Sequence, residues 1–304
     1  MHLTVLICTH NRAALLERTL ASLNRAHRPI NCSVNVLVVA NACTDNTSAF
    51  LENYQTQMAE KDWLPLIWLE EATPGKSHAL NHAIPELLSE LVAFVDDDHR
   101  IDKNYLVSIC NAAGSYPDAI LFCGRILPDW DGSEPAWVHD TGPYRIYPLP
   151  VPRQDHGKTS HPIGLEGPIP GGGNLFLRKT LFDRIGTFAT ELGPQGHNLG
   201  GGEDTDFVLR ALNSGEQLIY IPDVLQYHYV DPARLRLGYL LRKSFQRSRA
   251  AIRTHHTHER IPAHMWRKLA QYLFHAMYSL RWAKTRFYLV RIAAILGEMR
   301  GIHT

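Results

Sequence analysis

The chain has 304 residues, 45% of them hydrophobic and 20% charged, and this balance is typical of a globular protein and excludes a disordered one. The length suits one large α/β domain, or one domain with a helical appendage. The formal net charge of +1 hides an asymmetry, because residues 234–304 carry 15 Lys and Arg against two Glu, whereas the first 233 residues carry 16 basic against 28 acidic residues. A strongly basic tail indicates that the tail meets an anionic partner.

The five cysteines are odd in number and show no C-x-x-C spacing, which argues against a zinc site and against a disulfide framework. A reducing cytoplasm is therefore the expected location. The sequence enters an apolar run at 3–7 without a preceding basic segment, so we expect no signal peptide. No stretch of about 18 uninterrupted apolar residues occurs, and no transmembrane helix is expected.

The first half of the chain alternates strand-like and helical patterns. Apolar and β-branched runs predict strands at 3–8, 34–39, 64–69, 91–95 and 119–123. Between them, apolar residues at helical spacing predict helices at 12–26, after the 44–47 cluster, at 79–88 and at 103–113. Strands that alternate with helices over this length predict an α/β fold with a doubly wound, mostly parallel sheet.

The segment 124–170 breaks this alternation. Nine prolines exclude long regular elements there, so we expect a wandering loop region. Its aromatic residues could pack on sugar rings or lipid, or they could fix the loop to its own domain, and the second alternative is favoured. These residues are Trp130, Trp137, Tyr144 and Tyr147.

Regular patterns return after residue 170. Glycines at 171–173 lead into a short strand at 175–178, and a helix is expected from 179. Glycines at 200–202 run into an acidic helix start at 203, and two short strands are expected at 218–221 and 224–229. From residue 235 the pattern is helical almost to the end, with breaks at 255–262.

The predicted strand at 91–95 ends in three adjacent carboxylates, Asp96, Asp97 and Asp98. Open α/β sheets bind ligands at the carboxyl ends of their strands, and adjacent carboxylates repel one another unless a cation lies among them. Hard oxygen ligands suit Mg²⁺ or Mn²⁺, which commonly bridge carboxylates to substrate phosphates. A metal–diphosphate site is one interpretation, and a solvated acidic turn is the alternative.

Six short motifs in this order resemble those of the inverting glycosyltransferases of family 2, from about Leu3 to Tyr229. They are Thr9-His10-Asn11-Arg12, the run from Val39 to Asp45, Gly75-Lys76-Ser77 with Ala79-Leu80-Asn81, Asp96-Asp97-Asp98, Gly171-Gly172-Gly173-Asn174, and Glu203-Asp204. The resemblance implies a GT-A (Rossmann-like), mostly parallel sheet with flanking helices. It also implies a nucleoside-diphosphate sugar, UDP-linked, as donor and Mn²⁺ or Mg²⁺ as cofactor.

The resemblance also implies roles for residues of the donor site. Asp98 is expected to bind the metal, with Asp96 and His228 as further metal ligands, while Asp96 or Asp97 contacts the ribose. A divalent metal there would stabilise the charge of the leaving diphosphate. A lone histidine is more often structural, which is the alternative for His228. The remaining residues expected at the donor are Thr9, Asn11, Arg12, Asn41, Lys76 and Gly173.

Two of these assignments carry an alternative. The family usually has an Asp near position 41, whereas this chain has Asn41, whose amide can still hydrogen-bond a pyrimidine edge. Lys76 could reach a phosphate or the base, or could be a solvated lysine at a helix start. His10 stands where the family most often has Tyr, a change that preserves a flat surface.

The acidic pair Glu203-Asp204 is expected to perform the proton transfer. Inversion is a single displacement, so the acceptor hydroxyl must lose its proton to one positioned base. The resemblance makes Asp204 that base and lets Glu203 orient the acceptor. Helix N-capping by Asp is the alternative, and Asp206 is assigned to the helix or to a basic neighbour.

The expected domains are a GT-A catalytic domain at 1–232 and a helical extension at 233–304. The catalytic domain would divide into a nucleotide-binding half at about 1–124 and an acceptor-binding half at about 125–232. Processive members carry Gln-x-x-Arg-Trp, whereas residues 246–250 lack the Trp, which favours transfer of one sugar per encounter.

The basic, aromatic tail suits an anionic membrane surface, or packing on the catalytic domain or in a homodimer, and no motif supports nucleic acid. The expected location is thus the cytoplasm, with the protein peripheral on the inner face of the membrane.

The predicted activity is metal-dependent hexosyl transfer to a glycan or lipid-linked acceptor in bacterial-type polysaccharide or glycoconjugate synthesis. A nucleotidyltransferase would normally have a glycine-rich, basic loop after the first strand, which this chain lacks. A non-catalytic nucleotide- or glycan-binding module would not need both acidic motifs.

Overall fold

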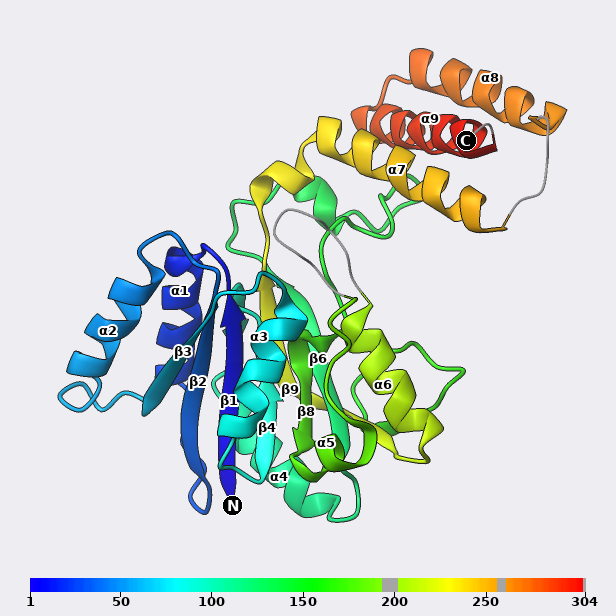
Figure 1. The fold of residues 1–304 in the computed structure, drawn as a ribbon. Helices are drawn as coiled ribbons and strands as arrows, with labels where there is room; N and C mark the ends of the chain where they lie inside the picture. The colour runs from blue at the N-terminus through cyan, green and yellow to red at the C-terminus, as the bar shows by residue number, and fades with distance from the viewer. Residues whose placement is uncertain (193–201, 256–260, 303–304) are drawn as a thin grey trace. The chain divides into compact units, whose positions relative to one another are not determined.

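The computed structural model describes residues 1–192, 202–255 and 261–302. The chain divides into two compact units, one formed by Met1–Asp129 with Arg153–Tyr229 and the other by Trp130–Pro152 with Val230–Thr304. The first unit contains a nine-stranded sheet with its helices, and the second is built mainly of helices (Figure 1).

The first half of the sheet is parallel. Its four strands, in the order β3-β2-β1-β4, are Leu66–Glu71, Ser33–Asn41, His2–Thr9 and Leu91–Phe94. All three pairings between them are parallel, so the carboxyl ends of these strands share one edge of the sheet. The strand ends that carry the expected donor-site motifs are therefore brought together.

The sheet continues beyond β4 in mixed orientation. The further strands, in the order β8-β6-β9-β5, are Leu175–Arg178, Leu121–Asp129, Leu218–Tyr229 and His99–Ile101, and β7, His161–Ile163, also pairs with β9. Pairings of β8 with β4 and β6 are antiparallel, whereas β6 and β9 are parallel. The α/β fold class and the mostly parallel sheet are confirmed, with antiparallel strands added at its second half.

Two strands predicted separately form one longer element in the structure. A single strand, β9, contains both the 218–221 and the 224–229 runs. The strand continues through Pro222 because this proline lies where the register between β6 and β9 shifts, between Cys123 and Arg125. A proline is tolerated at such an irregularity, where no ladder hydrogen bond is required. Opposite it, an added Cβ on Gly124 would lie 2.2 Å from the Val224 oxygen, so the close approach requires glycine.

Alternating side chains of the central strands separate two apolar layers. On β1, Leu3, Val5 and Ile7 belong to one buried cluster, and Leu6 belongs to the other. This period-two pattern is what a strand buried on both faces requires. The first cluster includes residues of α1 (Ala13–Asn24), α2 (Thr47–Gln57) and α4 (Tyr105–Ser115), and the second includes residues of α3 (Lys76–Ala83), α5 (Thr180–Ile185) and α6 (Glu203–Asn213).

The second unit has three main helices that lie side by side, α7 (Leu237–His255), α8 (Ala263–Met277) and α9 (Trp282–Ile302) (Figure 1). Gly297 of α9 faces α7 so closely that an added Cβ would lie 2.2 Å from the Phe245 oxygen. The segment 130–152 packs with them, since Tyr144 contacts Phe287 and Asp140 pairs with Arg286. Within the described residues, no helix is both long and apolar enough to cross a membrane.

The structure groups 130–152 with the carboxyl-terminal helices, and the catalytic domain at 1–232 with an extension at 233–304 stays a prediction. The contacts of Asp140 and Tyr144 are the reason for this grouping, because both are made to α9. The division of the chain into donor and acceptor halves also stays a prediction. Gly200 and Gly201 lie outside the described residues, as does most of the predicted helix break at 255–262.

Candidate active site

The three carboxylates after β4 lie in different surroundings. Asp97 is buried, accepts a hydrogen bond of 2.7 Å from the Thr9 hydroxyl and pairs with Arg12 at 3.0 Å. Burial raises its pKa to about 6, although the Arg12 cation opposes that rise. Arg12 also reaches Asp98 at 3.3 Å, so one guanidinium compensates two of the three charges. Thr9 and Arg12 thus hold the turn that contains the triplet.

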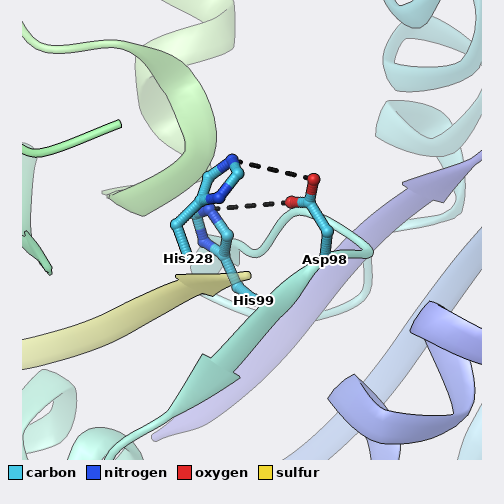
Figure 2. Close-up of side chains that lie close together, drawn as sticks. All are labelled: Asp98, His99 and His228. Carbon is cyan, nitrogen blue, oxygen red and sulfur yellow. Dashed lines mark ion pairs between the residues drawn. The ribbon is translucent and has the colours of Figure 1, made fainter. Parts of the chain in front are cut away.

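Asp98 lies beside two imidazole rings (Figure 2). Its carboxylate oxygens are 3.8 Å from His99 Nε2 and 3.7 Å from His228 Nε2. One ligand atom from each of these three residues lies within 4.8 Å of the other two, a spacing that can hold a single metal ion. Strand pairing produces this arrangement, since His99 of β5 is paired directly with His228 of β9.

Both histidines present the Nε2 atom to Asp98 because Nδ1 is already bonded. His228 Nδ1 donates to the Tyr229 oxygen at 2.6 Å, and His99 Nδ1 donates to Gln226 Oε1. Metal-bound histidines commonly fix their free nitrogen in this way. His99 Nε2 is buried and has no hydrogen-bond partner among the described residues. An unpartnered imidazole nitrogen facing a carboxylate fits a divalent cation, so the residues present fit the expected metal.

Lys76, at the start of α3, connects the two acidic motifs. Its ammonium lies 3.1 Å from Asp96 Oδ1 and 3.6 Å from Asp204 Oδ2, with the side chain only 24% exposed. Burial opposes its charge, but Asp204 and Asp96 together hold the pKa of Lys76 well above the usual value. In return, Lys76 and His99 lower the pKa of Asp96 despite burial. Asp96 and Asp204, far apart in sequence, therefore lie around one cation.

The glycine run before β8 is needed because these carboxylates come so close. An added Cβ on Gly172 would lie 2.1 Å from Asp204 Oδ1, and one on Gly173 would lie 2.4 Å from Asp96 Oδ2. A side chain at either position would force the facing carboxylate to move. Gly171 has no atom within 4 Å of its corresponding position. The predicted importance of Gly173 thus has a steric basis, which Gly172 shares.

Two asparagines expected at the donor hold loops at the same sheet edge. Asn11 Oδ1 accepts from the backbone nitrogens of Thr44 and Asp45. Asn41 is buried, accepts from Gly75 N at 2.8 Å and donates to the oxygens of Glu71, the last residue of β3, and of Thr73 in the loop that follows. Both amide hydrogens of Asn41 are used in this way, and a contact of this residue with a nucleobase stays a prediction.

The acidic pair opens α6 without capping it. Gly202 occupies the N-cap position with φ +115°, and no side chain caps the helix there. Asp204 instead faces Lys76, and Asp206 pairs with Arg210 at 2.8 Å, so capping by Asp204 is not its role in the structure. Glu203 is 3% exposed, and burial together with the neighbouring charge of Asp204 raises its pKa.

A cavity of about 280 Å³ lies over the strand ends. Its walls include Thr9, Arg12, Asn41, Lys76, the three aspartates and His228, all named from the sequence. Asn11, Gly173, Glu203 and Asp204 lie around it rather than in its wall. Burial raises the pKa of Cys8, another wall residue, to about 12, which keeps its thiol neutral.

Sequence reasoning missed His99 and Gln226. His99 directly follows the aspartate triplet, and its side chain is only 1% exposed. The adjacency was a usable signal, but the pairing of β5 with β9 was not predictable from three residues. Gln226 is fully buried and donates to Asn174 Oδ1 and to the Tyr105 hydroxyl, so a polar network supports His99.

Comparison with known proteins shows which family the chain belongs to. The Glycosyl transferase family 2 model matches residues 4–186. The succinoglycan biosynthesis protein ExoM of Rhizobium meliloti is 23% identical over 249 residues, covering 81% of this chain and 72% of that protein. The glucosyl-dolichyl phosphate glucuronosyltransferase of Haloferax volcanii is 22% identical over 249 residues, covering 81% and 74%.

Solved structures share the fold. TarS 1–349 of S. aureus, in complex with UDP, has a TM-score of 0.58 and 19% identity, covering 99% of this chain and 90% of that one. The mannosyltransferase PcManGT from Pyrobaculum calidifontis, in complex with GDP-Man and Mn²⁺, has a TM-score of 0.56 and 18% identity, covering 98% and 85%. These similarities confirm the expected GT-A architecture. Because the family match spans more than half of its length, the chain belongs to glycosyl transferase family 2 and is a glycosyltransferase.

Proposed function

We propose that the chain transfers one hexosyl group per encounter from a nucleoside-diphosphate sugar, UDP-linked, to a hydroxyl of a glycan or lipid-linked acceptor. Transfer inverts the anomeric carbon and depends on Mn²⁺ or Mg²⁺. The observation that carries the proposal is the meeting of the two acidic motifs at Lys76, where Asp96 and Asp204 contact the same ammonium. Inverting transfer needs a diphosphate site and a base within one substrate length, and this contact supplies that proximity.

The residues divide the work as follows. Asp98, His99 and His228 would hold the metal, with Asp96 beside His99 at 3.9 Å. The bound metal acts as a Lewis acid that stabilises the negative charge on the leaving diphosphate. Thr9 and Arg12 fix the aspartate turn, and the half-exposed Arg12 guanidinium also offers donors to the donor nucleotide.

Asp204 takes the proton in the single displacement. The acceptor oxygen forms its bond to the anomeric carbon while the bond from that carbon to the diphosphate oxygen breaks. The acceptor proton passes to the Asp204 carboxylate, and the diphosphate keeps the electron pair of the broken bond. Gly172 lets Asp204 approach the strand ends, and Glu203 orients the acceptor.

The relatives support the donor class and the pathway. One relative is named for succinoglycan biosynthesis and another for glucuronosyl transfer onto glucosyl-dolichyl phosphate. The structural neighbours were solved with UDP and with GDP-Man and Mn²⁺. These names favour bacterial-type polysaccharide or glycoconjugate synthesis for this chain. Since the neighbours hold different bases, the uridine donor rests on the sequence resemblance.

A panel of UDP-, GDP- and dTDP-sugars tests this function. We expect one donor to be hydrolysed slowly with Mn²⁺ or Mg²⁺, with EDTA abolishing turnover, and we expect the released sugar to appear first as the anomer opposite to the donor. Early-time proton NMR resolves the two anomers. Metal-independent turnover, or release of the same anomer, would contradict the metal role or the inversion respectively.

The proposed location is the inner face of the membrane, with α8 as the contact. Its outer stripe repeats at positions 266, 273, 274, 277 and 278, one face of a helix, and all five side chains are exposed. Arg267 and Lys268 flank this stripe and are also exposed. Exposed aromatics beside cations suit an anionic lipid surface.

Sedimentation with phosphatidylglycerol and phosphatidylcholine vesicles tests this location. Wild type should sediment only with the anionic vesicles, and Trp266→Ala with Phe274→Ala should abolish sedimentation. A concentration-dependent dimer that the same pair of changes dissociates would assign the stripe to a homodimer instead.

A further inference from the structure

The carboxyl-terminal unit contains a cavity of about 530 Å³, a size typical of ligand pockets. Three segments of that unit form its walls: the loop 145–152, α7 with the residue Arg234 before it, and α9. All of these residues belong to the second unit, so the cavity does not depend on the placement of the first.

The cavity wall carries five cations and one carboxylate, Glu298. The cations are Arg145, Arg234, Lys243, Arg247 and Arg291. In residues 1–192, 202–255 and 261–302, none of the five has a carboxylate oxygen within 4.0 Å, whereas Arg286 of the same unit pairs with Asp140. Such a concentration of like charge is unfavourable without an anion.

Several contacts hold the cationic side chains in place. The Arg145 guanidinium lies over the Tyr147 ring at 5.4 Å, and that of Arg291 lies over the Phe287 ring at 5.2 Å. Stacking of this kind lowers the entropy lost when an arginine binds a ligand. Lys243 and Arg247 are four residues apart on α7 and therefore share one face of the helix.

The floor of the cavity is formed by two closely packed helices, α7 and α9. The Ser244 hydroxyl of α7 donates to the Val290 oxygen of α9 at 3.1 Å, and both residues line the cavity. Two glycines of α9 allow the helices to approach closely. An added Cβ on Gly301 would lie 2.7 Å from the Arg249 oxygen, and one on Gly297 would lie 2.2 Å from the Phe245 oxygen. The close packing of α7 on α9 brings the cations of both helices to one cavity.

Apolar side chains fill the rest of the wall. Ile146, Leu149 and Val151 come from the loop, Leu240 from α7, and Val290 and Ala294 from α9. A small, fully hydrated anion would gain nothing from these groups. A phosphate ester with an apolar chain would pair its headgroup with the cations and bury its chain against the aliphatic wall.

We propose that this cavity is a binding site for a phosphate or diphosphate ester of an apolar alcohol. The phosphate oxygens contact Arg247 of α7 and Arg291 of α9, and the first part of the chain lies along the aliphatic wall. Only the identification of the natural ligand as the lipid carrier of the acceptor rests on the proposed function. The anion site itself stands on the charge and shape of the second unit.

Calorimetry on the full chain tests the site. Farnesyl diphosphate, inorganic pyrophosphate and farnesol are titrated below micelle-forming concentrations, in EDTA, so that metal-dependent binding at the strand ends does not contribute. We expect farnesyl diphosphate to bind at least tenfold more tightly than pyrophosphate, and farnesol not to bind measurably. Equal binding of pyrophosphate would overturn the apolar-chain assignment, and equal binding of farnesol would overturn the phosphate assignment.

Two double variants test whether the ligand binds in this cavity. Arg247→Gln with Arg291→Gln should weaken farnesyl diphosphate binding by about 100-fold, the loss of two charge-assisted contacts. The matched control, Arg267→Gln with Arg281→Gln, removes two exposed cations that do not line the cavity and should change binding less than twofold. Unchanged affinity in the first pair would refute the site.

Measuring nucleotide binding distinguishes a failure of this proposal from a failure of the proposed function. The Arg247 and Arg291 pair should bind UDP with Mn²⁺ like wild type, which also shows that the first unit of the variant is folded. Loss of farnesyl diphosphate binding with UDP binding intact supports the site even if no sugar donor is ever turned over. Farnesyl diphosphate binding that survives this pair refutes the site even in an active transferase.

Discussion

The two units each enclose a charged cavity, but they balance their charges in opposite ways. At the strand ends of the first unit, each aspartate of the triplet has a cation or imidazole of the same unit beside it, supplied by Arg12, Lys76 and two histidines. In the second unit, five cations face one glutamate, and within the described residues none of them reaches a carboxylate.

This difference indicates what each cavity needs from outside. The first holds three aspartates against the cations Arg12 and Lys76, so it keeps a net negative charge and gains most from a metal that arrives with the donor diphosphate. The second lacks a counter-ion and gains most from an anion alone. The comparison therefore predicts metal-dependent binding at the strand ends and metal-independent binding among the helices.

The largest expected effect is the loss of transfer in Asp204→Asn. An amide cannot accept the acceptor proton, so kcat should fall by at least about 1,000-fold while UDP binding with Mn²⁺ stays within about threefold. Steady-state transfer and calorimetry measure the two quantities. Asp206→Asn is the matched control, because Asp206 lies on the same helix and pairs with Arg210, and it should change kcat less than about twofold. Wild-type turnover in Asp204→Asn would remove Asp204 from the role of base.

Next in size is the loss of metal-dependent nucleotide affinity in Asp98→Ala. Removing a carboxylate ligand should weaken UDP binding in Mn²⁺ by about 100-fold and leave the weak binding in EDTA unchanged. His99→Gln should lose about tenfold under the same conditions, because it removes the unpartnered Nε2 atom. Calorimetry with and without metal separates the metal-dependent part of the UDP affinity from the metal-independent part. Unchanged affinity of Asp98→Ala in Mn²⁺ would show that the first cavity does not need a metal.

A smaller loss is expected when the backbone approach to Asp204 is blocked. Gly172→Ala should lower kcat by about 10- to 100-fold, because the new methyl group overlaps the Asp204 carboxylate and displaces it. Gly171→Ala places the same methyl group where no atom lies within 4 Å, and it should keep activity within about twofold. Equal activity of the two variants would mean that the position of Asp204 is not critical.

Much of the first unit follows from short-range patterns in the sequence. The alternation of Leu3, Val5 and Ile7 with Leu6 predicts a strand buried on both faces, and parallel order then brings the motif-bearing strand ends together. Lys76 shows the limit of this reasoning. Its position at a helix start was predictable, but its ion pairs with Asp96 and Asp204 depend on three segments distant in sequence.

The second unit was less predictable because its contacts are long-range. Asp140 and Arg286 are 146 positions apart, and no local pattern indicates that the loop and α9 pack together. The basic character of the tail is evident from composition, yet the five cations of the cavity were not separable from the other basic residues of the tail. Only the packing of the loop 145–152 with α7 and α9 distinguishes them.

The smallest expected effect concerns Glu203, a buried carboxylate of the first unit that lies beside the like charge of Asp204. Burial and repulsion by Asp204 raise its pKa in the folded state above the value in the unfolded chain, near 4.3. The folded state therefore loses stability as pH rises above the unfolded value, and the loss is complete above the folded value. Glu203→Gln removes that loss, so its Tm should equal that of wild type near pH 4 and exceed it by about 1 to 3 °C at pH 7.

Thermal unfolding of both proteins across this pH range measures the difference. Asp206→Asn is again the control, because Asp206 is paired with Arg210 and its loss should not stabilise the protein at pH 7. A difference between Glu203→Gln and wild type that does not grow with pH would show that the first unit compensates Glu203 as fully as its other carboxylates. A growing difference, together with reduced transfer, would mean that the enzyme keeps a destabilising charge beside Asp204 because the acceptor needs it.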